Sequence, residues 1–421
     1  MAARKSVGTD RIVAIPPHDG SGAPAVYAKA RSNSSNAGTR EEANVTLHAL
    51  TPARRSTRSS DLEHRRRVWL LVGASAVTTL AVTVFLSQGH RYDFAAFYGD
   101  GAAWNRGSEL YTRANLNPPS ATVALFAPLA RFSFAHAQIA WTIAGVVALF
   151  GSVRVVAREL AWSPVQALTG AAMLLVTHAA YQVFAFGQVT WLLLWPATMA
   201  WAAYRHDRLP VAGAWFGILV AFKPTFAIAA VLLSWPVWVT AAGVSISISA
   251  LAVSVTGWSA WQRWLETGRA VSWIEDPLSA SAWGVFARFE GVSRLSDLSP
   301  ASVLLVIVLG GWAVWRTMSV TRPDRRLVCA WLLHATIAPL GWIYYLPLAF
   351  GPVAGSWPRG AAARIGLALL CVPMGLIEPK PFPVLLGLTF PLALFCAWTA
   401  WTVPEKSTGH PLIAGNKALD L

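Results

Sequence analysis

Long apolar segments separated by short polar stretches dominate the chain from residue 68 onward. A helix needs about 20 apolar residues to cross the ~30 Å hydrocarbon core of a bilayer, and fewer where neighbouring helices shield it. By this measure we count about twelve candidate spans, which predicts an all-α polytopic membrane protein. The spans lie near residues 68–87, 135–153, 164–182, 187–204, 209–222, 224–241, 242–258, 301–317, 326–341, 342–356, 361–377 and 382–403.

The first 67 residues show no apolar periodicity and are rich in Ser, Ala, Gly, Pro and Arg. Such a segment cannot bury enough apolar surface to offset the entropy of ordering. Three arginines at 65–67 close it, and the positive-inside rule then keeps the amino terminus in the cytoplasm. We expect a disordered cytoplasmic tail over 1–67, a membrane domain over 68–403 and a short cytoplasmic tail over 404–421.

Alternating the spans from a cytoplasmic start places the arginines of the short loops on the cytoplasmic side. These are Arg154 and Arg158, Arg205 and Arg208, the cluster at 322–326, and Arg359 with Arg364. Two long segments, about 88–134 and 259–300, are then outside. The joints at 222–224 and 341–342 have almost no loop, and an error at either would invert everything downstream.

Composition supports a membrane protein, since 55% of the residues are hydrophobic, 13% are charged and 22 are tryptophan. The formal net charge of +14 does not indicate a nucleic-acid partner, because the basic residues are spread over the tail and loops. Cys329, Cys371 and Cys396 lie in apolar runs without close pairing, which is typical of small core residues. No phosphate loop, dinucleotide fingerprint, HExxH, GxSxG or metal-ligand cluster occurs, so we predict no metal and no cofactor.

The stretch "RYDFAAFYGDGAAWNRGSELY", residues 91–111, follows the first span and differs from its surroundings. Asp93, Phe97, Asp100 and Trp104 recur at helical spacing, which predicts a short helix along the membrane surface with both carboxylates on one face. Such a helix could hold a general base at the boundary of water and lipid. Spacing alone favours the alternative, an interfacial amphipathic helix whose acids are only solvated.

The next stretch, "NLNPPSATVALFAPLARF", contains Pro118 and Pro119, which end one helix and begin another. It is too short to cross a bilayer, so we expect a second surface helix packed beside the first. The alternative is a transmembrane hairpin over 118–153, which would put Arg154 and Arg158 outside, against the charge rule.

Two polar positions occur where predicted spans meet. Gly187 and Gln188 lie at an outer turn, where the amide either binds a ligand or joins helices. Lys223 precedes Pro224 in an otherwise apolar region, and a compact ammonium at that depth suits a lipid-linked phosphate. The alternative for Lys223 is that it extends to the interface without a ligand.

Aromatic residues gather in two further stretches. "APLGWIYYLPLAF" brings Trp342, Tyr344 and Tyr345 to an outer helix boundary, where an aromatic belt is the expected arrangement. The second exterior segment interleaves tryptophans with charged residues such as Arg269 and Asp276. Aromatic rings flanked by hydrogen-bonding groups suit a sugar, although a loop on the lipid surface has a similar composition.

Taken in order, "YDFAAFYGDGAAWNRGSELY", "NLNPP", "FAPLARF", "GQVTWLLL", "FKP" and "APLGWIYY" resemble the GT87 glycosyltransferases, which have a GT-C fold. The resemblance covers roughly residues 68–400. It implies a GT-C-like bundle with exterior surface helices in the first long loop. It also implies transfer of mannose from a polyprenyl phosphate on the outer face of the bacterial plasma membrane.

The resemblance also assigns roles to individual residues. The family's acid after the first span, taken as the general base, matches Asp93, and its Lys-Pro matches Lys223 with Pro224. Its Gly-Gln turn matches Gly187 and Gln188. Three positions depart from the family pattern: Thr190 replaces an Asn, Ala338 replaces a Ser, and Tyr344 stands where a His is often found. The departure at Tyr344 weakens the case for mannose.

The resulting hypothesis is an inverting hexosyltransferase of the bacterial inner membrane with its site on the periplasmic face. A polyprenyl-phosphate sugar and a glycolipid or glycan acceptor would be its partners, without nucleic acid. Asp93 would be the base and Lys223 would bind the donor phosphate. Arg91, Asp100, Asn117, Gln188, Trp342 and Tyr344 would contact substrate, with Asp100 as reserve base.

Two other classes fit the same composition. A transporter or flippase for lipid-linked glycans would also have about a dozen spans, but its polar site is expected near the bilayer centre. A glycolipid-binding sensor or scaffold would bind without turnover.

Overall fold

The computed structural model describes residue 73 and residues 92–111, 115–175, 177–272, 274–276, 279 and 281–356. These residues belong to one compact unit. They form helices joined by loops, and the β pairing among them is an isolated bridge between Ser279 and Trp342. The all-α prediction is confirmed for this part of the chain. The predicted tails at 1–67 and 404–421, the spans at 361–377 and 382–403, the span at 68–87 apart from residue 73, and Arg91, Cys371 and Cys396 lie outside the described residues.

The first predicted exterior segment, about 88–134, contains the two helices that its sequence predicts. Helix α2 (Tyr92–Asn105) is followed by a helix that begins at Pro119 and ends at Leu129, with a π turn at its centre. Its parts are α3 (Pro119–Ala121), η2 (Thr122–Phe126) and α4 (Ala127–Leu129). Pro118 is extended and Pro119 occupies the first helical turn, as proline requires.

The two helices pack tightly against each other. The rings of Phe97 and Phe126 lie 4.9 Å apart between centroids. A Cβ on Gly101 would lie 2.5 Å from the carbonyl oxygen of Phe126, so only glycine permits this approach. The next long helix begins after Leu129 with Ser133 as its N-cap, so the helix over 119–129 is separate from it and is shorter than a candidate membrane span.

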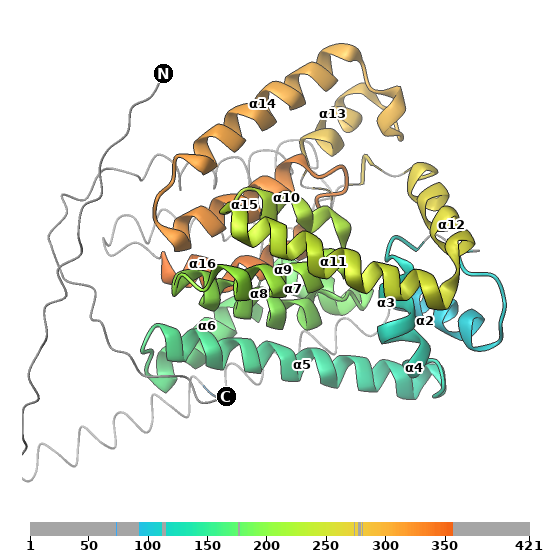
Figure 1. The fold of residues 1–421 in the computed structure, drawn as a ribbon, viewed down its shortest axis with the longest axis horizontal. Helices are drawn as coiled ribbons and strands as arrows, with labels where there is room; N and C mark the ends of the chain where they lie inside the picture. Colours follow the sequence, from blue (N-terminus) through green and yellow to red (C-terminus); the bar gives the residue numbers. More distant parts are fainter. Residues whose placement is uncertain are drawn as a thin grey trace, which may run out of the picture. The chain divides into compact units, whose positions relative to one another are not determined.

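The remaining helices form a bundle with a second exterior segment (Figure 1). The bundle comprises α5 (Phe134–Glu159), α6 (Pro164–Leu175), α7 (His178–Phe186), α8 (Thr190–Arg205), α9 (Leu209–Phe222), η3 (Pro224–Phe226), α10 (Ala227–Val231), α11 (Trp235–Thr256), α14 (Pro300–Met318), α15 (Pro323–Ile337), η5 (Ile343–Ala349) and α16 (Phe350–Gly355). The second exterior segment comprises α12 (Trp258–Arg269), α13 (Ala282–Glu290) and η4 (Leu295–Asp297). Cys329 is buried in α15, as expected of a small core residue.

The predicted number of about twelve spans is not confirmed. Among the described residues, α5, α11 and α14 are long and apolar enough to cross a membrane, and the bent pair of α6 and α7 adds a fourth span if counted as one. Other predicted spans coincide with helices that are shorter, such as α9 with its 14 residues. Helix α9, for example, begins after Arg208 and ends at Phe222, with Lys223 as its C-cap directly before Pro224.

The predicted boundary between spans 224–241 and 242–258 is wrong. Helix α11 begins at Trp235 and continues to Thr256 without a break. The preceding turn lies at Leu232 and Leu233, whose carbonyl oxygens accept hydrogen bonds of 3.0 and 3.1 Å from the guanidinium of Arg326. Sequence alone places the break too late, because the apolar run continues across it.

Helices α9 and α11 are parallel neighbours. A Cβ on Gly213 would lie 2.5 Å from the carbonyl oxygen of Val237, and a Cβ on Gly217 would lie 2.8 Å from that of Ala241. Since the two helices run in the same direction, η3 and α10 must carry the chain back between them.

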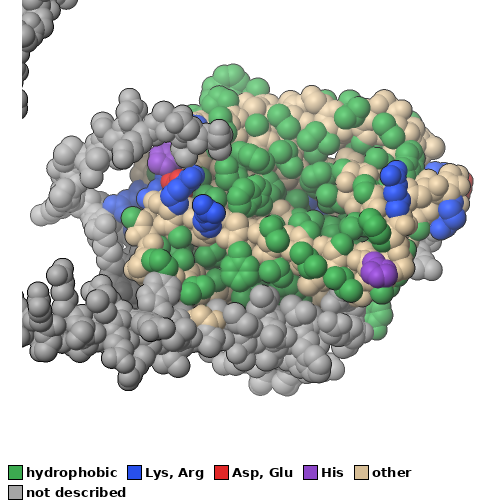
Figure 2. Space-filling model, turned by 90° about the horizontal axis from the view of Figure 1, so that it is seen from below, with side chains coloured by type: hydrophobic (Ala, Val, Ile, Leu, Met, Phe, Trp, Pro, Cys, Tyr) green, Lys and Arg blue, Asp and Glu red, His purple; other side chains and the backbone are tan. Residues whose placement is uncertain are grey.

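Polar side chains gather at two opposite ends of the bundle. At one end, Asp324 accepts a hydrogen bond of 2.7 Å from Trp201 Nε1 and pairs with Arg205 at 3.4 Å. His206 and Glu159 pair there at 2.6 Å between Nε2 and Oε2. Hydrophobic side chains fill the zone between the ends of the face in Figure 2, and the basic side chains gather mostly beyond it. The opposite end holds the residues that the sequence analysis selected.

Candidate active site

The turn between α7 and α8 fixes Gln188 against α2. Gly187 ends α7 in the left-handed conformation, with φ 69°. A Cβ at this position would lie 2.6 Å from Cβ of Phe94, and the Gly187 carbonyl accepts a 2.9 Å hydrogen bond from Trp141. In this position the Gln188 amide donates a hydrogen bond from Nε2 to Oδ2 of Asp93. The predicted glutamine and carboxylate are thus partners.

Gly187→Ala is expected to destabilise the protein and separate Gln188 from Asp93. The left-handed conformation costs a non-glycine residue about 1 kcal/mol, and the collision with Phe94 adds to this cost. The measurement is the melting temperature in detergent, with Gly243→Ala as control. Gly243 lies in α11, and a methyl group added there would meet no atom within 4 Å, so its variant should melt no lower than the parent. Equal melting temperatures for both variants would contradict the packing argument.

Asp93 has the properties of a general base. Burial raises the pKa of its carboxyl from 3.8 to about 6, against the opposing effects of the Lys223 charge and the Gln188 hydrogen bond. The negative charge of Asp276 adds to the rise. A carboxylate is the stronger base when its pKa is raised, and a pKa near 6 still leaves it ionised at neutral pH.

Lys223 lies where α9 gives way to η3. Its side chain is buried, with 9% exposed, and Nζ donates a 3.0 Å hydrogen bond to Oδ1 of Asn117. The ammonium also lies 5.9 Å from the ring centroid of Tyr345. Among the described residues, no carboxylate lies within 4 Å of the Lys223 ammonium. Asp93 is close enough for its negative charge to act on Lys223, but the two side chains do not form an ion pair. A buried cation held by a neutral amide is suited to an anionic ligand.

Asp100 has different hydrogen-bond partners from Asp93. Its Oδ1 accepts a 3.1 Å hydrogen bond from the backbone of Tyr111, and its Oδ2 accepts one of 2.6 Å from Asn115. Asn115 in turn accepts a 2.9 Å hydrogen bond from the backbone of Asn117. Asp100 therefore shapes the loop that presents Asn117 to Lys223, and both its oxygens are engaged.

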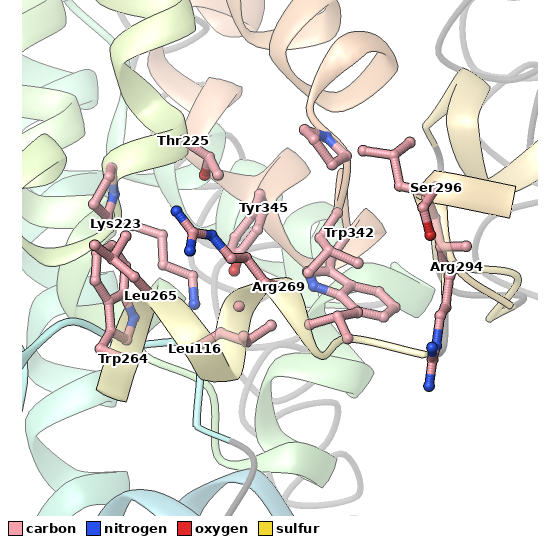
Figure 3. Close-up of a pocket in the computed structure, with 17 residues that line it drawn as sticks. Leu116, Lys223, Thr225, Trp264, Leu265, Arg269, Arg294, Ser296, Trp342 and Tyr345 are labelled. Atoms are coloured by element: carbon pink, nitrogen blue, oxygen red, sulfur yellow. The ribbon is translucent and has the colours of Figure 1, made fainter. Parts of the chain in front are cut away.

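A cavity of about 660 Å³ opens beside Lys223. Figure 3 shows Lys223, Thr225, Arg269 and Tyr345 grouped on one side of it and Arg294 with Ser296 on the other. Three lining residues are cationic, three are aromatic, and most of the others are apolar. The cations are Lys223, Arg269 and Arg294, and the aromatic residues are Trp264, Trp342 and Tyr345. None of the described residues that line the cavity is acidic, so the cavity suits an anion with an apolar body.

The aromatic residues at the end of α15 form a wall of this cavity. Trp342 lines it and stacks on Tyr344, with 5.6 Å between ring centroids and 15° between planes. Tyr344 is buried behind Trp342 and does not line the cavity. The bridge from Ser279 to Trp342 joins this wall to the second exterior segment. Trp342 is thus placed to contact a ligand, and Tyr344 supports it.

The second exterior segment supplies the other wall. Arg269 of α12 lines the cavity, whereas Arg263 pairs with Glu109 of the first exterior segment at 3.4 Å. Arg288 of α13 donates hydrogen bonds to the carbonyls of Asp276 at 2.9 Å and Ser279 at 3.4 Å. The Arg263–Glu109 pair thus links the two segments, and the Arg288 hydrogen bonds tie α13 to the chain that precedes it.

The structure brings together most of the predicted site residues that it describes. Asp93, Asn117, Gln188, Lys223 and Trp342 lie in one region, linked by the contacts above. Asp93 itself does not line the cavity of about 660 Å³. Lys223 does line it, and its positive charge also acts on the Asp93 carboxylate. Sequence reasoning missed the following residues: Thr225, Trp264, Arg294 and, behind the cavity, His334.

The fold and the site together define a membrane-associated protein with a partly buried carboxylate near a basic, aromatic cavity. The model of glycosyltransferase family 87 matches residues 115–342, more than half of the chain, so the protein belongs to this family and is a glycosyltransferase. The match includes Gln188, Lys223 and Trp342, whereas Asp93 precedes it. Searches of curated proteins and of solved structures each found no match.

Proposed function

We propose that this glycosyltransferase moves a hexose, mannose by family resemblance, from a polyprenyl phosphate to a glycolipid or glycan acceptor. The observation that carries the proposal is the cavity with three cations, three aromatic rings and an apolar lining, one of whose cations, Lys223, acts electrostatically on the partly buried Asp93 carboxylate. A lipid-linked sugar phosphate has the matching parts: an anion, a sugar with an apolar face and a hydrocarbon chain. A soluble nucleotide sugar would not require so apolar a lining.

In the proposed reaction, Asp93 removes the proton from the acceptor hydroxyl as its oxygen attacks the anomeric carbon. The new bond joins the acceptor oxygen to that carbon, and the bond from the carbon to the phosphate oxygen breaks. The electron pair leaves with the phosphate, which departs as polyprenyl phosphate, and the anomeric configuration inverts. Gln188 holds the Asp93 carboxylate in place through its amide.

Lys223 is the proposed ligand of the donor phosphate. Its ammonium is fixed by Asn117 and by the Tyr345 ring, so it needs little reorganisation when charge develops on the leaving group. Arg269 would add a second cation from the exterior segment. Trp264 and Trp342 offer flat surfaces for the apolar face of the sugar.

The proposed location is the bacterial inner membrane, with the site on the periplasmic side and the amino terminus in the cytoplasm. The polar network of Arg205, Asp324 and Arg326 lies at the end of the bundle opposite to Lys223. Basic residues favour the cytoplasmic side, which supports this orientation. Placement of the site at one end, away from the bilayer centre, favours an enzyme over a transporter.

The direct test is transfer of radiolabelled mannose from polyprenyl-phosphate-mannose to membrane glycolipid by the purified protein in detergent. Detergent removes any sealed compartment, so transport alone cannot produce a labelled product. Formation of labelled glycolipid is the expected result. If mannose and other hexoses on polyprenyl phosphate all remain untransferred while the folded protein binds them, the donor assignment is overturned.

A further inference from the structure

His334 is a buried polar side chain that the proposed reaction does not use. It lies on α15, fully buried, with its ring 4.9 Å from Phe226 and 5.9 Å from Tyr345 between centroids. Nε2 lies 3.3 Å from Oγ1 of Thr225, whereas Nδ1 has no hydrogen-bond partner among the described residues. An imidazole at this depth is costly, and such residues usually have a functional reason.

The surroundings of His334 select one tautomer. An imidazole enclosed by aromatic rings is neutral, because a charge there would lose its solvation. The neutral ring carries one N–H donor and one acceptor nitrogen. A buried N–H without an acceptor is rarer than a buried acceptor without a donor. The hydrogen of the neutral ring therefore belongs on Nε2, and the Nε2–H group donates a hydrogen bond to Oγ1 of Thr225.

This assignment determines what Thr225 can do. Since the Thr225 oxygen accepts from His334, its own hydroxyl hydrogen must find another acceptor. Thr225 follows Pro224 and lines the cavity beside Lys223, as Figure 3 shows. None of the described groups accepts the hydroxyl hydrogen, which leaves it available to a ligand in the cavity.

We propose that Thr225 donates a hydrogen bond to the donor phosphate beside Lys223, and that His334 is the positioning residue that makes Thr225 a donor. This inference rests on the proposed function, since it assigns a further ligand to the same phosphate. Lys223 supplies charge without strong directionality, whereas a hydroxyl fixed by a buried imidazole supplies direction. A hydrogen bond to a charged group changes affinity by about 10- to 100-fold.

The test compares binding of a short-chain polyprenyl phosphate with binding of the matching neutral polyprenol by purified full-length protein in detergent. Thr225→Val removes the hydroxyl at constant shape and is expected to weaken phosphate binding about 10- to 100-fold without changing polyprenol binding. Thr225→Ser retains the hydroxyl and is the matched control, expected to bind within about threefold of the parent. Melting temperatures check that each variant is folded.

His334→Phe keeps an aromatic ring but removes the donor, so it should weaken phosphate binding to the same degree. Because His334 acts through Thr225, the double variant Thr225→Val with His334→Phe should bind no more weakly than either single variant. Additive losses would overturn the positioning role. If His334→Phe does not fold, the comparison of valine with serine at 225 still decides the role of the hydroxyl.

The polyprenol comparison separates this inference from the proposed function. A wild-type protein that binds polyprenyl phosphate no better than polyprenol would contradict the proposed donor. A wild-type protein that prefers the phosphate, combined with an unchanged preference in Thr225→Val, would overturn only the role of Thr225.

Discussion

Asp93→Asn is expected to lower the transfer rate by about 10²- to 10⁴-fold, the usual contribution of a general base. The asparagine carbonyl can still accept the hydrogen bond from Gln188, so the variant should fold normally. Its amide cannot take the proton of the acceptor hydroxyl. The measurement is kcat for mannose transfer at saturating donor, with the melting temperature as a check on folding.

The pH profile of the parent enzyme gives an independent readout of the same residue. The base must be ionised to act, and the pKa of Asp93 is raised to about 6. The transfer rate should therefore be constant above about pH 7 and fall as the pH drops through 6. If the transfer rate instead falls only near pH 4, where an ordinary aspartate titrates, the base would be a more exposed carboxyl than Asp93.

Asp100→Asn is the matched control, since it makes the same change on the same helix. Both oxygens of Asp100 accept hydrogen bonds from the loop that follows α2, so this variant should lower the melting temperature more than it lowers the rate per folded molecule. Loss of transfer in Asp100→Asn together with near-parental transfer in Asp93→Asn would assign the base to Asp100.

The helices of the first exterior segment could be predicted because their signals are local. Pro118 and Pro119 define where a helix begins, and the spacing of Asp93 and Asp100 matches one face of a helix. The family resemblance selected Asp93 as the base, but the hydrogen-bond partners of the two carboxylates could not be predicted. These partners are Gln188 and Asn115, and only the packing of α2 against the α7–α8 turn and the following loop decides which carboxylate meets which amide.

The membrane spans were harder to delimit, because hydropathy does not distinguish a break in an apolar run from its continuation. The turn at Leu232 depends on the guanidinium of Arg326, which lies far away in sequence. Thr225 and His334 were missed for a similar reason, since their relation depends on η3 packing beside α15. A histidine in an apolar helix was nevertheless a visible signal, by the same reasoning that selected Lys223.

Lys223→Met is expected to raise the KM for the donor and lower kcat, with a combined loss in kcat/KM of about 10²- to 10³-fold. Methionine fills the space of the lysine stem but cannot offset the charge of the leaving phosphate. The positive charge of Lys223 also lowers the pKa of Asp93, so its removal should move the acidic limb of the pH profile above pH 6.

Arg294→Met is the matched control for Lys223→Met, because it removes a cation from the other side of the same cavity. Arg294 is exposed, and water and salt screen its charge, so this variant should lose less activity and leave the pH profile unchanged. The two variants therefore distinguish a phosphate ligand from a general effect of charge. Equal small losses in both, with no shift of the acidic limb in Lys223→Met, would show that Lys223 neither binds the phosphate nor acts on Asp93.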